Sequence, residues 1–105
     1  MKKFNGNTII ERNEAEFISS LLGDDIVLMN TVNGDYVGMN AVGTDIWHLL
    51  KAPLSADEII TRVINIYEID EQQGREKLNA FLQVMLDHRV IFISEVPLSK
   101  VSEIG

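Results

Sequence analysis

The sequence predicts a small α+β domain of the winged-helix type, in which a three-stranded antiparallel sheet precedes three helices. Three observations predict this fold. Asn33 and Gly34 lie between two β-prone runs, and this dipeptide is the strongest short-range signal for a hairpin. Ser55 and Glu58 have the spacing of a helix capping box. Apolar residues then recur at helical spacing through the second half of the chain.

The predicted sheet is an antiparallel meander of short strands. Residues 16–22 alternate weakly, and the turn beginning at Gly23 leads into a middle strand over residues 26–31. The next turn is predicted as type I′ at residues 33–34, which requires positive φ at both positions. The third strand, over residues 35–39, therefore lies at an edge of the sheet. A little further strand is expected at Thr8, Ile9 and Ile10.

Each predicted helix has its own start signal. The first covers residues 41–50 with Asn40 as its cap, the second opens at Ser55, and the third opens at Asp70. The apolar run at residues 90–93 is expected to form a strand or extended segment that packs back on the domain. The bulky side chains assigned to the core are Trp47, Tyr67, Phe81 and Leu82.

At 105 residues the chain is expected to form one domain. We predict an N-terminal extension over residues 1–15, the folded domain over residues 16–93, and a flexible C-terminal tail over residues 94–105. Two lysines near the start have no apolar run behind them, so a secretory signal is not expected, and a cytoplasmic location is the simplest interpretation.

Composition narrows the classes of partner. The net charge is −7, and the resulting negative electrostatic field disfavours binding to both nucleic acid and anionic membrane surfaces. No apolar run is long enough to span a bilayer. The chain has no cysteine, which excludes disulfides, thiol nucleophiles and zinc–cysteine sites.

The sequence shows no catalytic or metal-binding arrangement. His48 and His88 are far apart, and neither lies in an HxxxH or ExxH pair. The acidic pairs at residues 24–25 and 57–58 fall at a turn and a helix start, where local hydrogen bonding explains them. We therefore expect no enzyme activity, no cofactor and no metal.

A winged-helix outline raises DNA binding as an alternative, because such folds often place the third helix in the major groove. Residues 70–89 do not have the charge that this requires. Their basic residues are Arg75, Lys77 and Arg89, and their acidic residues are Asp70, Glu71, Glu76 and Asp87. Without basic residues that contact the phosphates, the helix cannot be positioned on the duplex to read the base edges. This alternative predicts retention on a heparin column.

The third predicted strand is expected to be the binding surface of the protein. Residues 35–39 contain neither lysine nor proline, the residues with which proteins usually keep an unpaired edge strand from pairing with other chains. Gly38 either leaves room for a close ligand or marks a tight packing point. On the third helix, the expected core-facing set is Leu78, Leu82 and Met85, and the residues that widen the apolar surface are Phe81, Val84 and Leu86.

Residues 16–93 contain a series of short motifs in a fixed order and spacing. They are Ile26-Val27-Leu28-Met29, Asn33-Gly34-Asp35-Tyr36-Val37-Gly38-Met39-Asn40, Gly43, Ile46-Trp47, Leu49-Leu50, Pro53, Ser55, Glu58-Ile59, Tyr67, Phe81-Leu82 and Val90-Ile91. In this order and spacing, residues 16–93 resemble the PqqD family. Two positions depart from the pattern. Met39 stands where leucine is usual, and Arg89 stands where the family often has glycine, which puts the local turn in question.

The resemblance implies a peptide-binding domain, the recognition element of ribosomally made and modified peptides. In that family a leader peptide adds to the third strand, lies in the groove beside the third helix, and is presented to modifying enzymes. The link at residues 49–55 looks most like the leader-binding subunit of lasso-peptide maturation, whose partner is a leader-cleaving protease. The runner-up is the pyrroloquinoline quinone pathway, whose partner is a radical SAM enzyme.

The resemblance and the edge-strand argument together give a set of peptide-binding residues. They are Asp35, Tyr36, Val37, Gly38, Met39, Arg75, Lys77, Leu78, Phe81 and Leu82. Arg75 and Lys77 are the candidates for pairing with acidic leader residues. Proline at Val37 is expected to abolish peptide binding while the domain stays folded, because the cost to folding is tolerable if the Val37 N–H faces outward. The same bare edge could pair with its own copy, so we expect a monomer or a weak homodimer.

Overall fold

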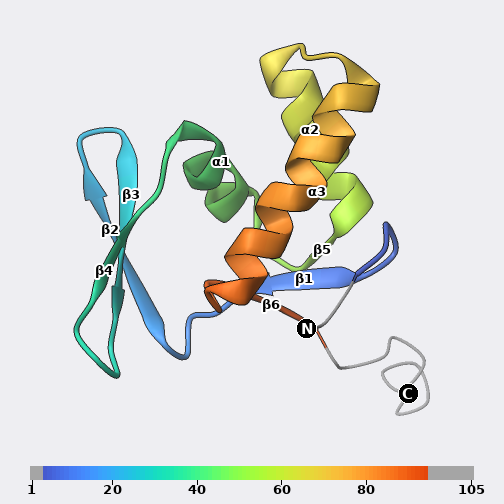
Figure 1. Ribbon diagram of the computed structural model, residues 1–105. Helices are drawn as coiled ribbons and strands as arrows, with labels where there is room; N and C mark the ends of the chain where they lie inside the picture. The colour runs from blue at the N-terminus through green and yellow to red at the C-terminus, as the bar shows by residue number, and fades with distance from the viewer. Residues whose placement is uncertain (1–3, 95–105) are drawn as a thin grey trace.

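A computed structural model describes residues 4–94 and shows the predicted antiparallel meander. Its strands are β2 (Phe17–Leu22), β3 (Asp25–Asn30) and β4 (Tyr36–Gly38), hydrogen-bonded in the order β2-β3-β4. In Figure 1 this sheet stands to the left of the helices. The α+β fold class predicted from the sequence is confirmed.

The hairpin between β3 and β4 is longer than predicted. Gly34 has a φ of +78°, but Asn33 is not among the residues with positive φ, so the type I′ prediction is wrong. The Asn30 side-chain oxygen instead accepts hydrogen bonds from the N–H groups of Val32 and Asn33 at 2.8 and 3.2 Å. The Gly34 N–H donates to the Asn30 carbonyl at 2.8 Å. These bonds organise a five-residue loop in place of the two-residue turn.

A second sheet, below the helices in Figure 1, joins three distant parts of the chain. Its strands are β5 (Leu54–Ser55), β1 (Ile9–Arg12) and β6 (Ile91–Ile93), in the order β5-β1-β6. The short strands expected near residues 8–10 and 90–93 are both present. Ile10 and Ile91 are fully buried in this sheet, so β1 contributes to the core.

The helices begin where the sequence predicts. They are α1 (Ala41–Leu49), α2 (Ala56–Tyr67) and α3 (Glu71–Asp87). The side chains of Asn40, Ser55 and Asp70 accept hydrogen bonds from N–H groups three residues on, at 2.8, 3.1 and 3.0 Å. Each cap satisfies one of the unpaired donors of a first helical turn. Within residues 4–94, no helix is long and apolar enough to cross a membrane.

The core predictions hold for two of the four bulky side chains. Trp47 and Leu82 are buried, with 2% and 0% of their surface exposed. The core assignment of Tyr67 is wrong, because 37% of its surface is exposed and its hydroxyl donates a hydrogen bond to the Asp45 carboxylate at the surface. This hydrogen bond raises the pKa of Tyr67 above its usual value. Phe81 is half-buried against the core.

The last turn of α3 explains how Arg89 replaces a glycine. Arg89 has a φ of +63°, its N–H donates to the Leu86 carbonyl, and the Val90 N–H donates to the Met85 carbonyl. These two bonds form a Schellman motif, in which the left-handed position is usually glycine. The turn questioned by the sequence is therefore present, with a non-glycine residue in a strained conformation.

We expect Arg89→Gly to raise the free energy of unfolding by about 0.5–1 kcal/mol, because glycine adopts positive φ without the steric cost. The substitution removes only an exposed ion pair with Glu16 at 3.3 Å, and such pairs contribute little. Urea denaturation measures the change. Arg89→Ala is the control, since it loses the ion pair and keeps the strain. A less stable glycine variant would contradict this account.

The expected flexibility of residues 94–105 concerns a segment that lies almost entirely outside the described residues. Only Ser94 is described, and its N–H donates to the Ile9 carbonyl at 2.8 Å.

Candidate functional site

The hydrogen bonds of the β3–β4 ladder show which backbone groups remain free. The Met39 N–H donates to the Ile26 carbonyl at 2.9 Å, and the Asn30 N–H donates to the Asp35 carbonyl at 2.7 Å. Hydrogen-bonded and non-hydrogen-bonded pairs alternate along an antiparallel ladder. The pair midway between these two, residues 28 and 37, is therefore also hydrogen-bonded. The N–H and C=O of residue 37 point toward β3.

The free groups on the outer edge of β4 belong to Tyr36 and Gly38. No strand in residues 4–94 pairs with this edge. A Cβ at Gly38 would meet no atom within 4 Å, so Gly38 is not a tight packing point and the space beside it is open. Since the donor of Val37 faces inward, a proline there would break the sheet and would not test the edge. The proline test belongs at Gly38.

A groove runs alongside this edge, between β4 and α3. It has a volume of about 220 Å³. Its lining is mostly apolar and consists of Val37, Gly38, Met39, Asn40, Phe81, Val84, Met85, His88 and Val90. Met39, Met85 and Val90 are buried and form its floor, whereas Val84 is 49% exposed on its wall. A row of free backbone groups therefore lies beside an apolar trough.

One glycine allows α1 to approach the groove. A Cβ at Gly43 would lie 3.1 Å from the Met39 sulfur and 3.4 Å from Cζ of Phe81. The first distance is tighter than ordinary packing, so the small residue lets Met39 and Phe81 lie against the start of the helix. The Asn40 cap holds the same turn through its hydrogen bond to the Gly43 N–H. The cap and the glycine thus set the position of one end of the groove.

The groove face of α3 follows a helical stripe that includes Phe81, Val84 and His88. Phe81 and Val84 widen the apolar surface as the sequence suggests. Leu86 instead lines a hollow on the opposite flank of the helix. Lys77 is exposed one turn before Phe81 and lies on the same stripe, so it extends the groove face toward the start of α3.

The structure brings only part of the predicted site together. Val37, Gly38, Met39 and Phe81 line the groove, Tyr36 is exposed at its edge, and Asp35 lies in the adjoining loop. Leu78 and Leu82 are 5% and 0% exposed and face the core, not the groove. The site residues that the predicted set missed are Asn40, Val84, Met85, His88 and Val90. The 81–84–88 spacing on α3 was the available signal for two of them.

Arg75 is held on the other side of α3. Its guanidinium lies 2.8 Å from Asp57, 3.3 Å from Glu71 and 3.2 Å from the Thr61 hydroxyl. These contacts tie α3 to α2, and Arg75 does not line the groove. Arg89 also has an acidic partner, Glu16. With both arginines paired, α3 offers few free cations for a nucleic-acid backbone.

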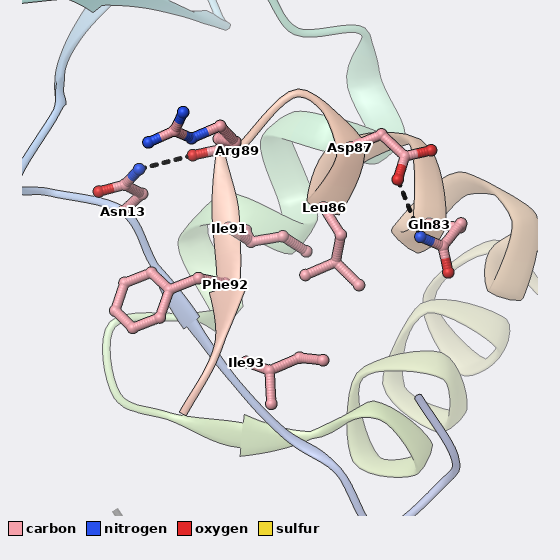
Figure 2. Close-up of a pocket in the computed structure, with 8 residues that line it drawn as sticks. All are labelled: Asn13, Gln83, Leu86, Asp87, Arg89, Ile91, Phe92 and Ile93. Carbon is pink, nitrogen blue, oxygen red and sulfur yellow. Dashed lines mark hydrogen bonds between the residues drawn. The ribbon is translucent and has the colours of Figure 1, made fainter. Parts of the chain in front are cut away.

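A larger hollow of about 350 Å³ lies on the opposite flank of α3. Figure 2 shows Leu86, Ile91 and Ile93 pointing into it from α3 and β6, whereas Phe92 points away. The chain continues from the end of β6 into residues 95–105, which lie outside the described part. The groove beside β4 shares no lining residue with this hollow.

Comparison with known proteins gives two matches. A family model described as "Coenzyme PQQ synthesis protein D (PqqD)" matches residues 25–91, which is more than half of the chain. Among solved structures, the chain is similar to one described as "TbiB1 in Complex with the TbiA(beta) Leader Peptide". The TM-score is 0.68 at 24% identity, and the match covers 83% of this chain and 98% of that chain. No curated protein matches. At this identity the structural likeness supports the fold.

Proposed function

The chain belongs to the PqqD family, and from this premise we propose that it binds the leader segment of a ribosomally made precursor peptide. The observation that carries the proposal is the bare β4 edge beside the apolar groove. An extended peptide can complete such an edge, with backbone pairing giving affinity and side-chain pockets giving specificity. The similar structure is described as a complex with a leader peptide, which supports a leader peptide as the ligand.

The leader would pair with the backbone groups of Tyr36 and Gly38. These two residues offer two donors and two acceptors, and a net value of about 1 kcal/mol for each bond gives about 4 kcal/mol. That sum corresponds to about millimolar affinity, so micromolar binding requires about as much again. One or two apolar leader side chains buried in the groove would supply it, at about 1.5–3 kcal/mol each. Backbone pairing and the groove must therefore act together.

Alternation along the added strand divides the leader side chains between two surfaces. Every second side chain would point toward Met39 and Val84, on the groove side, and the others would point to the opposite face of the sheet. The apolar lining favours aliphatic or aromatic leader residues on the groove side. Lys77 and His88 lie toward the two ends of the α3 stripe, where an acidic leader residue would find a partner.

We further propose that the partner enzyme is the leader-cleaving protease of lasso-peptide maturation, on the strength of the Leu-Leu-x-x-Pro-Leu-Ser link at residues 49–55. The description of the matching family favours a second candidate, in which a radical SAM enzyme of pyrroloquinoline quinone synthesis receives the peptide. In both cases this chain binds and presents the peptide, and the chemistry belongs to the partner. Pull-down with each purified enzyme in the presence of its precursor distinguishes them.

An NMR titration tests leader binding. The probe is a synthetic peptide with the sequence of a candidate precursor's leader, with a scrambled peptide as control. We expect amide shifts concentrated at residues 36–39 and 81–88, because these two segments line the edge and groove together. Shifts confined to residues 91–93, beside the hollow of Figure 2, would place binding elsewhere. No shifts with the leader would overturn the proposal.

A further inference from the structure

The outer face of the β2-β3-β4 sheet is unusually apolar. Phe17, Ile26, Leu28 and Met39 are at most 8% exposed and define the inner face. Because side chains alternate along a strand, the positions between them face outward. These outward residues are Ile18, Ser20, Leu22, Asp25, Val27, Met29, Tyr36 and Gly38. Only Asp25 is charged, whereas the side chains on the solvent-facing side of an antiparallel sheet are usually polar.

The apolar positions form a continuous row across the sheet. Ile18 lies directly opposite Met29, and Met29 lies directly opposite Tyr36. The exposed fractions of Ile18 and Tyr36 are 54% and 71%, and Leu22 on the same face is 73% exposed. None of these residues lines the groove between β4 and α3. An exposed apolar surface of this kind typically marks an interaction site.

We propose that the outer sheet face, defined by Ile18, Leu22, Val27, Met29 and Tyr36, is the docking surface for the maturation enzyme. The inference rests on the proposed function. A leader strand added to β4 would place every second side chain on this same face, next to Tyr36. The row from Ile18 to Tyr36 would then continue into the substrate. The enzyme would contact carrier and leader on one surface and bind the loaded carrier more tightly than the empty one.

The choice of occupant follows from continuity and charge. The row ends at the β4 edge, so an enzyme that acts on the leader can reach both at once. A second copy of this chain is a poorer occupant, because two molecules of net charge −7 repel each other. The face itself carries only Asp25, so the complementary enzyme surface should be apolar and largely uncharged.

The test uses Ile18→Glu and a matched control, Ile66→Glu. Ile66 lies on α2 and is also 54% exposed, so the two variants place the same charge at equal exposure. For each variant we would measure leader affinity by fluorescence anisotropy. We would measure the affinity for each candidate enzyme, the leader-cleaving protease and the radical SAM enzyme, with and without leader by biolayer interferometry. We expect Ile18→Glu to weaken enzyme binding by about tenfold or more, as for a buried interface position, with leader affinity unchanged. Ile66→Glu should change neither.

The outcomes separate this inference from the proposed function. Wild-type leader affinity with undiminished enzyme binding by Ile18→Glu would overturn the docking surface alone. Equal enzyme affinity for the loaded and empty carrier would overturn the shared surface of carrier and leader. A wild-type chain that dimerises through Ile18, seen as a concentration-dependent mass that the variant abolishes, would assign the face to a second copy. Failure of the wild-type chain to bind leader would instead overturn the proposed function.

Discussion

Gly38→Pro is expected to abolish leader binding while the domain stays folded. The Gly38 N–H points outward from β4, so proline removes a donor that the leader would use and no donor that the sheet uses. Loss of one ladder bond of about 1 kcal/mol weakens binding by about fivefold, and the pyrrolidine ring also projects into the space that the leader backbone would occupy. Isothermal titration with the leader peptide measures the loss, and circular dichroism measures the fold.

Two further variants serve as comparisons for Gly38→Pro. Gly38→Ala adds a Cβ that meets no protein atom within 4 Å and keeps the N–H, so it should bind leader and remain as stable as the wild-type chain. Val37→Pro should lower the melting temperature, because it removes a bond to β3 inside the sheet. Unchanged leader affinity in folded Gly38→Pro would show that peptides do not add to this edge.

The parts of the fold predicted from the sequence are those that local interactions determine. Asn40, Ser55 and Asp70 bond to N–H groups only three residues away, so their cap roles can be predicted from short motifs. The β5-β1-β6 sheet could not be predicted as a unit. It joins strands of two to four residues from the start, middle and end of the chain, and no short segment carries the signal of such pairing.

The candidate site divides in the same way. The β4 side followed from the hairpin, because the strand order sets which edge is bare. The α3 side depends on how the helix is rotated against the core, and this rotation directs Leu78 and Leu82 inward and Val84 into the groove. The role of Arg75 depends on Asp57 in another helix, 2.8 Å away in space and eighteen positions away in sequence. Composition alone could not show that this arginine is already paired.

Val84→Asp is expected to weaken leader binding by about a hundredfold or more. Val84 is 49% exposed on the wall of the groove, so the free domain can hydrate a carboxylate there and should lose little stability. In the complex, a leader side chain would cover that carboxylate and remove its hydrating water, which costs several kcal/mol.

Asn79→Asp is the matched control, because it adds the same charge to an exposed position on the other side of α3. It should leave leader affinity within about twofold of the wild-type value, since a distant surface charge is largely screened. Fluorescence anisotropy with labelled leader compares the two variants. If both bind leader as the wild-type chain does, backbone pairing at β4 would have to act without the groove, and its roughly 4 kcal/mol allows only about millimolar affinity.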